Sequence, residues 1–187
     1  MPKPFYQPPP ADADVITSPH QVWDQALVCL NGHVVNDRYR GDPTRNSPFC
    51  SVCGAASVAH CEKCNAPVPG FYYEYRRTRS YAPTGTPLLA PPQFCEACGS
   101  AFPWTERRIE AAMEYVDEFS KLSADERAQL AAGLDELIKQ TPRQAVAAMR
   151  VQTLLAKAGA GAAKAVRDIL VDVLSKAAKD QVFGPGS

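Results

Sequence analysis

The sequence lacks the short motifs that identify many enzymes. It contains no P-loop, no glycine-rich dinucleotide turn, no His-Glu-x-x-His and no Gly-x-Ser-x-Gly. No apolar run approaches the roughly 18 residues of a membrane-spanning helix, and the first residues lack the basic-then-apolar pattern of a secretory signal. We therefore expect a cytoplasmic protein without membrane contact, and the missing motifs favour a non-enzymatic role without deciding it.

An excess of charge is also absent, because 20 Lys and Arg residues balance 20 Asp and Glu residues. Two divalent ions held by seven thiolates would bring the net charge to about −3. A nucleic-acid-binding domain usually carries a broad basic surface. Composition therefore does not favour nucleic-acid binding, although a local basic patch remains open.

Cysteine is absent after Cys98, and this absence divides the chain. Residues 1–14 are proline-rich and predict a disordered tail. Residues 15–104 carry all seven cysteines and predict a metal-stabilised module, whereas residues 105–183 are rich in Ala, Leu, Lys and Glu and predict a helical domain. Residues 184–187 read as a native tail or a cloning remnant.

The cysteines occur in pairs with metal-ligand spacing. Three pairs have the form Cys-x-x-Cys, and the remaining cysteine is followed four positions later by a histidine. Two tetrahedral zinc ions need eight such ligands, and thiolate-rich four-ligand sites are structural rather than catalytic. The predicted ligands of two structural Zn²⁺ ions are Cys29, His33, Cys50, Cys53, Cys61, Cys64, Cys95 and Cys98, and no catalytic residue is predicted. His60 is left over and reads as a solvent-facing side chain.

Spacing alone leaves open which pairs share an ion. Consecutive pairing gives a Cys₃His site and then a Cys₄ site in two zinc ribbons of the treble-clef or ribbon type. Crossed pairing gives a RING-like cross-brace, as in ubiquitin-ligase components, and nested pairing joins the second pair to the third. We favour consecutive pairing, since the histidine belongs to the first pair whereas a RING places it in mid-motif.

The residue after each Cys-x-x-Cys indicates a tight turn. Gly54 and Gly99 follow two of the pairs, and Asn65 follows the third. A zinc knuckle needs a positive φ at this position, which Gly adopts freely and Asn tolerates best among the other residues. The three motifs therefore predict knuckles whose backbone amides point at the thiolates.

These motifs carry a resemblance to a known family. The runs LVCLNGHVVN, FCSVCG, CEKCNAPVPG and FCEACGSAFPWTE, followed by a helical tail, resemble a family of uncharacterised bacterial zinc-ribbon proteins, a domain of unknown function. The similarity covers most of the chain after the proline-rich start. It implies a bacterial cytoplasmic protein with tandem zinc ribbons, and it implies no activity.

Apolar residues recur at helical spacing after Trp104. Thr105, Ser123 and Thr141-Pro142 are predicted helix starts. The pattern predicts four helices, at about residues 106–120, 124–139, 142–158 and 162–181, in a bundle that could also form a homodimer. The predicted fold class is α+β, with a small two-zinc ribbon module followed by a roughly four-helix domain.

Tyrosines and arginines interleave between the third and fourth ligand pairs. A hairpin there would present Tyr73, Tyr75, Arg76, Arg77 and Arg79, which are residue types common in protein-binding hot spots and in base stacking. The ordinary alternative is a hairpin whose tyrosines pack on the ribbon. The leading hypothesis is a zinc-stabilised adaptor that binds a protein partner through these residues and the helical domain; nucleic-acid binding and a RING-like role are the alternatives.

Overall fold

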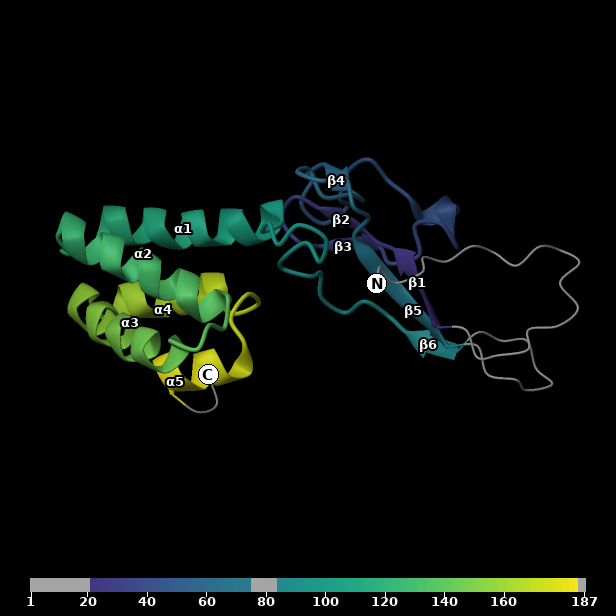
Figure 1. The fold of residues 1–187 in the computed structure, drawn as a ribbon. Coiled ribbons are helices and arrows are strands. Elements are labelled where there is room, and N and C mark those ends of the chain that lie inside the picture. Colours follow the sequence, from purple (N-terminus) through teal and green to yellow (C-terminus); the bar gives the residue numbers. More distant parts are fainter. Residues whose placement is uncertain (1–20, 75–83, 185–187) are drawn as a thin grey trace, which may run out of the picture. The chain divides into compact units, whose positions relative to one another are not determined.

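The computed structural model describes residues 21–74 and 84–184, which fall into two compact units, and the boundary along the chain lies between Trp104 and Thr105 (Figure 1). The first unit holds small antiparallel sheets and the second holds five helices. The predicted fold class is confirmed, since a two-cluster Cys/His module precedes a helical domain. The tail predicted for residues 1–14 lies outside the described residues.

Two three-stranded sheets form the first unit. One has the strand order β1-β5-β6, with β1 at Gln21–Gln25, β5 at Pro69–Glu74 and β6 at Thr84–Thr86. The other has the order β3-β2-β4, with β2 at Leu27–Cys29, β3 at Val34–Asn36 and β4 at Ser57–Val58. A single 3₁₀ turn, Pro43–Arg45, interrupts the loop between β3 and β4.

The apolar run that leads to Cys29 is two strands rather than one. The chain changes sheets at Ala26, whose N–H donates to Val68 O at 2.8 Å, while Gln25 O accepts from Tyr39 N–H at 2.8 Å. The β1–β5 register shifts between Trp23 and Gln25, as at a β-bulge. This change of partner strand delivers Cys29 into the second sheet.

One apolar cluster supports both the sheets and the second ligand set. Its buried members are Ala26, Val28, Cys61, Val68, Cys95, Phe102 and Trp104. The Phe102 and Trp104 rings stack with centroids 4.6 Å apart, and Trp104 Nε1 donates to Pro92 O at 2.8 Å. Two predicted metal ligands are therefore part of the core itself.

A buried carboxylate ties a loop to β1. Asp24 is fully buried, and its oxygens accept from the N–H groups of Arg40 and Gly41 at 3.1 and 3.0 Å. The Tyr73 hydroxyl donates to the same carboxylate at 3.3 Å. A buried carboxylate is tolerable only with such partners, so this group serves the fold.

Gly70 in β5 lies where no side chain fits. A Cβ at this position would meet the backbone carbonyl of Asp37, and it would lie 2.7 Å from Gln25 C and 2.8 Å from Ala26 N. Backbone cannot yield as a flexible side chain does, so we expect Gly70→Ala to destabilise the first unit by about 2 kcal/mol or more. Urea unfolding followed by tryptophan fluorescence measures this, because both tryptophans, Trp23 and Trp104, lie in the first unit.

The matched control for this substitution is Gly161→Ala in the second unit, where nothing lies within 4 Å of the added Cβ. We expect the fluorescence transition of the control to be unchanged. Circular dichroism, which follows the helices, should show equal or slightly higher stability, because Ala has a higher helix propensity than Gly. Equal stability of Gly70→Ala and the unsubstituted protein would contradict the close approach at Gly70.

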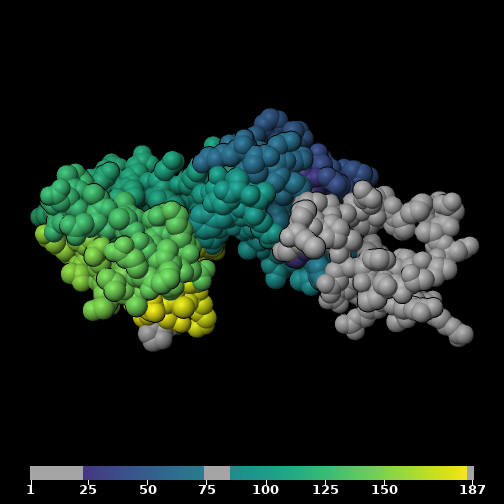
Figure 2. Space-filling view, viewed as in Figure 1, coloured from purple at the N-terminus to yellow at the C-terminus, as the bar shows by residue number. Residues whose placement is uncertain are grey.

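The second unit consists of helices α1 at Pro103–Phe119, α2 at Ala124–Ile138, α3 at Gln144–Ala158, α4 at Ala160–Leu170 and α5 at Lys176–Phe183. Leu130, Leu134, Val151, Val166 and Leu170 are fully buried in it. In the space-filling view, the atoms of the neighbouring helices α1, α2 and α3 form a continuous surface (Figure 2).

The predicted helix starts have different outcomes. Ser123 caps α2 at the predicted start and forms a capping box, since its Oγ accepts from Glu126 N–H at 3.3 Å and its N–H donates to Glu126 Oε2 at 2.9 Å. Thr105 is not a cap, because α1 already begins at Pro103, where the fixed φ of proline suits a first helical turn. Pro142 lies in a turn ahead of α3, which begins at Gln144.

The helix predicted over residues 162–181 is wrong as a single helix. Helix α4 ends at Leu170, and after a turn Ser175, whose φ and ψ are −63° and 157°, caps α5 by accepting at its Oγ from Ala178 N–H at 3.2 Å. The apolar stripe continues unbroken because the turn between the helices keeps Val173 and Leu174 buried. Periodicity therefore could not reveal the break, and the domain has five helices.

Within the described residues, no helix combines the length and the apolar character that crossing a membrane requires.

Candidate metal centres

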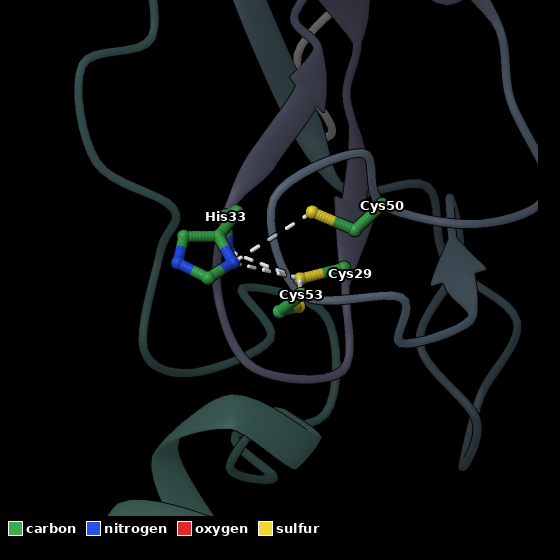
Figure 3. Close-up of side chains that lie close together, drawn as sticks. All are labelled: Cys29, His33, Cys50 and Cys53. Atoms are coloured by element: carbon green, nitrogen blue, oxygen red, sulfur yellow. Dashed lines mark hydrogen bonds between the residues drawn. The ribbon is translucent and has the colours of Figure 1, made fainter.

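The eight predicted ligands converge in two groups of four. Cys29, His33, Cys50 and Cys53 form the first site, and Cys61, Cys64, Cys95 and Cys98 form the second. Within each group the ligand atoms all lie within 4.8 Å of one another. Figure 3 shows the first site, with the His33 ring facing the sulfurs of the three cysteines.

The consecutive pairing favoured from the sequence is the one observed, since the first pair meets the second and the third meets the fourth. The crossed arrangement is therefore wrong, and with it the RING-like alternative loses the geometry on which it depended. His60 belongs to neither group; its Nε2 lies 2.9 Å from Gln25 Nε2.

Each Cys-x-x-Cys motif forms the same knuckle. The residue after the second cysteine has a positive φ, at 70° for Gly54, 58° for Asn65 and 72° for Gly99, which confirms the prediction. Its N–H donates at 2.8 Å to the carbonyl of the first cysteine in each motif. Local sequence thus shapes each half-site before the halves meet.

The first site has a compact mixed donor set. His33 Nδ1 lies 3.5 Å from Cys29 Sγ and 3.7 Å from Cys50 Sγ, and the Cys29 and Cys53 sulfurs are 3.7 Å apart. The second site has sulfur–sulfur distances of 3.8 Å for Cys61 and Cys98 and 3.6 Å for Cys64 and Cys95.

These distances fit a tetrahedron around one ion. Zinc–sulfur bonds of about 2.3 Å place two sulfurs about 3.8 Å apart at the tetrahedral angle, and a zinc–nitrogen bond of about 2.0 Å shortens the nitrogen–sulfur edge to about 3.5 Å. The residues present therefore fit a tetrahedral ion at both sites.

The Cys64 and Cys98 thiols of the second site differ widely in pKa. The Ala66 amide lowers the pKa of Cys64, but neighbouring thiols, Cys98 foremost, outweigh it and raise this pKa to about 12. Hydrogen bonds from the side chain and backbone of Ser100 lower the pKa of Cys98 to about 6. Because adjacent thiolates repel, four of them coexist only with a compensating cation.

Two thiols of the first site also differ in the direction of their pKa shifts. Desolvation raises the pKa of Cys29. Desolvation also opposes ionisation of Cys50, but amide hydrogen bonds from Val52 and Cys53 prevail and lower its pKa to about 7. Such a set gives up its remaining protons when a metal ion binds.

In each pair of ligands, the first residue is buried and the second is exposed to solvent. Cys29, Cys50, Cys61 and Cys95 are buried, whereas their partners His33, Cys53, Cys64 and Cys98 are exposed. One side of each site therefore belongs to the core and the other faces solvent.

The residues around the ligands were not predicted from the sequence. Asn31 Nδ2 donates to Cys53 Sγ at 3.5 Å, and the His33 N–H donates to Cys29 Sγ at 3.3 Å. In the second site, Ser100 Oγ lies 3.3 Å from Cys98 Sγ. Their positions in the sequence could have indicated them, because polar residues inside or just after a knuckle lie within reach of its sulfurs.

Comparison with known families adds to this geometry. Residues 22–182 match a family described as Uncharacterized protein conserved in bacteria (DUF2321). The chain belongs to this family. The predicted resemblance to an uncharacterised bacterial family is thereby confirmed. No curated protein and no solved structure matched the chain. Membership of DUF2321 brings no activity with it, so function has to be argued from the chain.

The predicted partner-binding residues divide into two groups. Tyr73 is 6% exposed and packs with its ring centroid 4.6 Å from that of Phe71, so its side chain belongs to the interior. Tyr75, Arg76, Arg77 and Arg79 lie outside the described residues. Only these four remain candidates for partner contact.

Proposed function

We propose that this chain is a zinc-stabilised, non-enzymatic interaction protein that binds a protein partner. The supporting observation is that each site brings four ligand atoms within 4.8 Å of one another. A catalytic zinc takes three protein ligands and keeps a fourth position for water or substrate, whereas a complete Cys/His set of four is typical of a structural ion. The metal then serves the fold, and function belongs to the surfaces that the fold presents.

Zinc is the ion that the donor sets favour. Iron also accepts four thiolates in a tetrahedron. Zinc is a single kind of metal that suits both sites, because Cys₃His and Cys₄ are both ordinary ligand sets of structural zinc. We therefore assign one Zn²⁺ to each site.

The proposed partner surface is the Tyr/Arg segment, residues 75–79, together with the helical unit. The described strands on either side support this choice, since Glu74 of β5 pairs with Thr84 of β6 and Tyr72 pairs with Thr86. Both ends of the intervening chain are thus attached to one end of a sheet in the metal-stabilised unit. Tyr and Arg are the residue types that contribute most to protein interfaces.

The test is affinity purification from the native bacterium with a triple variant, Tyr75→Ala, Arg76→Ala and Arg77→Ala. We expect the main co-purifying protein to be lost, since hot-spot residues dominate binding energy. The matched control is Arg45→Ala with Lys121→Ala, which removes charge at two exposed positions elsewhere. If every co-purifying protein is retained by the triple variant, the assignment of this segment is wrong.

Nucleic-acid binding is the second candidate, because interleaved tyrosines and arginines also suit base stacking. The dependence of binding on salt concentration distinguishes nucleic-acid binding from binding of a protein partner. Nucleic-acid binding weakens steeply as ionic strength rises, through release of counterions. No retention of single-stranded DNA or RNA at low salt would remove this candidate.

A further inference from the structure

The helical unit carries an open groove between three helices. It has a volume of about 350 Å³ and lies between α3, α4 and α5. Buried Leu155 and Val182 and half-buried Phe183 contribute apolar surface to it. Lys164 and Arg167 of α4 add two cationic side chains. The groove therefore combines an apolar lining with positive charge.

The helices that line the groove carry more basic than acidic residues. Residues 144–183 contain six Lys and Arg residues against three Asp residues. All three acids are already in ion pairs: Asp168 with Arg167 at 3.3 Å, Asp172 with Arg108 at 3.1 Å, and Asp180 with Lys176 at 3.0 Å. Within the described part of the chain, Lys164 has no ion pair, so a ligand anion there would meet an uncompensated cation.

An exposed apolar face on α3 continues from the groove. Gln152 and Ala156 line the groove, and Met149 lies three residues before Gln152 on the same face of the helix. Met149 is 71% exposed. From Met149 to Ala156 this face spans about 10 Å, or nearly two helical turns. An exposed methionine, with its flexible side chain, is common at adaptable binding surfaces.

The shape of the groove suits a helix better than a small molecule. Ala156 and Ala160, which line it, are exposed to solvent. Small-molecule sites bury 70–90% of their ligand, which a groove with exposed walls does not do. An amphipathic helix needs burial on one face only, and it is recognised through apolar residues spaced three and four apart.

We propose that this groove binds an acidic amphipathic helix of a partner protein, with the apolar face of that helix against α3 and α5 and its carboxylates beside Lys164 and Arg167. The inference rests on the proposed function as an interaction protein, and it names a second surface and the chemistry of what that surface binds. Because the groove is positively charged, a negatively charged partner is favoured and its approach is steered by electrostatic attraction.

The test uses a fluorescent helical peptide of about 18 residues, long enough for five turns, with Leu along one face and Glu on both flanks. A second peptide replaces every Glu with Lys, and fluorescence anisotropy measures binding of each to the full chain. We expect the Glu peptide to bind and the Lys peptide not to bind. We expect Lys164→Glu and Ala156→Glu each to weaken binding of the Glu peptide by about tenfold or more, since a like charge would face its carboxylates.

Matched controls separate a local effect from a general one. Lys121→Glu makes the same charge change at an exposed position between α1 and α2, and Ala128→Glu places the same side chain on an exposed position of α2. Both are expected to bind like the unsubstituted protein. Circular dichroism and the unfolding temperature confirm that all four variants keep their helices.

Three results would overturn the proposal. They are equal binding of the two peptides, equal effects of the groove and control substitutions, and binding of anionic phosphatidylglycerol vesicles that Lys164→Glu abolishes while the Glu peptide does not bind. Partner capture that depends on Tyr75, Arg76 and Arg77 tests the proposed function separately. If the Glu peptide does not bind but partner capture still depends on Tyr75, Arg76 and Arg77, only the groove proposal is wrong. If neither peptide binding nor such partner capture is observed, the proposed function is wrong as well.

Discussion

Removal of the metal is expected to unfold the first unit of the chain and to leave the helices of the second unit folded. A structural zinc ion contributes on the order of 10 kcal/mol to the folding of a small domain, more than the whole stability of many domains. Cys61 and Cys95 are part of the apolar cluster that contains Phe102 and Trp104. Once the ion has gone, the thiolates repel, and the core around them loses two of its members.

Two optical signals separate the units in this experiment. Both tryptophans lie in the first unit, so their fluorescence follows it, whereas far-ultraviolet circular dichroism follows the five helices. Chelation of the purified protein should shift the fluorescence to that of exposed indole and retain most of the helical signal. Elemental analysis before chelation should find two zinc ions per chain, one for each ligand group.

Substitution of single ligands gives the same test without a chelator. We expect His33→Ala to lower the zinc content to one ion per chain and to destabilise the first unit. The matched control is His60→Ala, which removes a histidine that lies outside both groups of ligands. Unchanged tryptophan fluorescence after complete removal of zinc would show that the metal does not hold this unit together, and it would contradict the proposed structural role.

Trp104→Ala is expected to have the second largest effect, a loss of about 3–5 kcal/mol of stability, as for other large buried aromatic residues. Trp104 is 2% exposed, stacks on Phe102 at 4.6 Å and donates a hydrogen bond to Pro92 O. Truncation leaves a cavity beside Cys61 and Cys95, so zinc should also pass more readily to a competing chelating dye. The rate of this transfer and the urea midpoint measure the two effects.

Phe119→Ala is the matched control, because Phe119 is an aromatic residue of the same helix, α1, and is 61% exposed. Its truncation should cost less than about 1 kcal/mol and leave zinc transfer unchanged. Trp104→Phe keeps an aromatic ring and removes the indole N–H, so an intermediate loss is expected. Equal losses for Trp104→Ala and Phe119→Ala would mean that the cluster does not support the second site.

Local sequence predicted the parts of the metal sites that depend on local geometry. The ligands come in pairs three or four positions apart, and the turn after each Cys-x-x-Cys needs a positive φ that Gly54, Asn65 and Gly99 supply. The capping box at Ser123 was predictable for the same reason, since it joins residues only three apart. In each case the interacting groups lie within one turn of the chain.

Other features depended on partners far along the chain. Tyr73 was predicted to face a partner, but it is buried, and its hydroxyl donates a hydrogen bond to Asp24, a residue 49 positions away. The strand break at Ala26 follows from hydrogen bonds to Val68 and Tyr39, and the groove of the helical unit joins residues of α3 to Val182 and Phe183. Hydrophobic periodicity is a local pattern and does not predict contacts between residues far apart in the sequence.

The sequence by itself predicted the eight candidate ligands, the knuckles and the change from a cysteine-rich module to helices, because each follows from residue type and short spacing. Only the tertiary structure decided which ligand pairs meet, because consecutive, crossed and nested pairings satisfy the same spacing. The decision comes from long-range packing: β2 joins β3 and β4 and so brings Cys29 and His33 to Cys50 and Cys53, while one apolar cluster draws Cys61 toward Cys95.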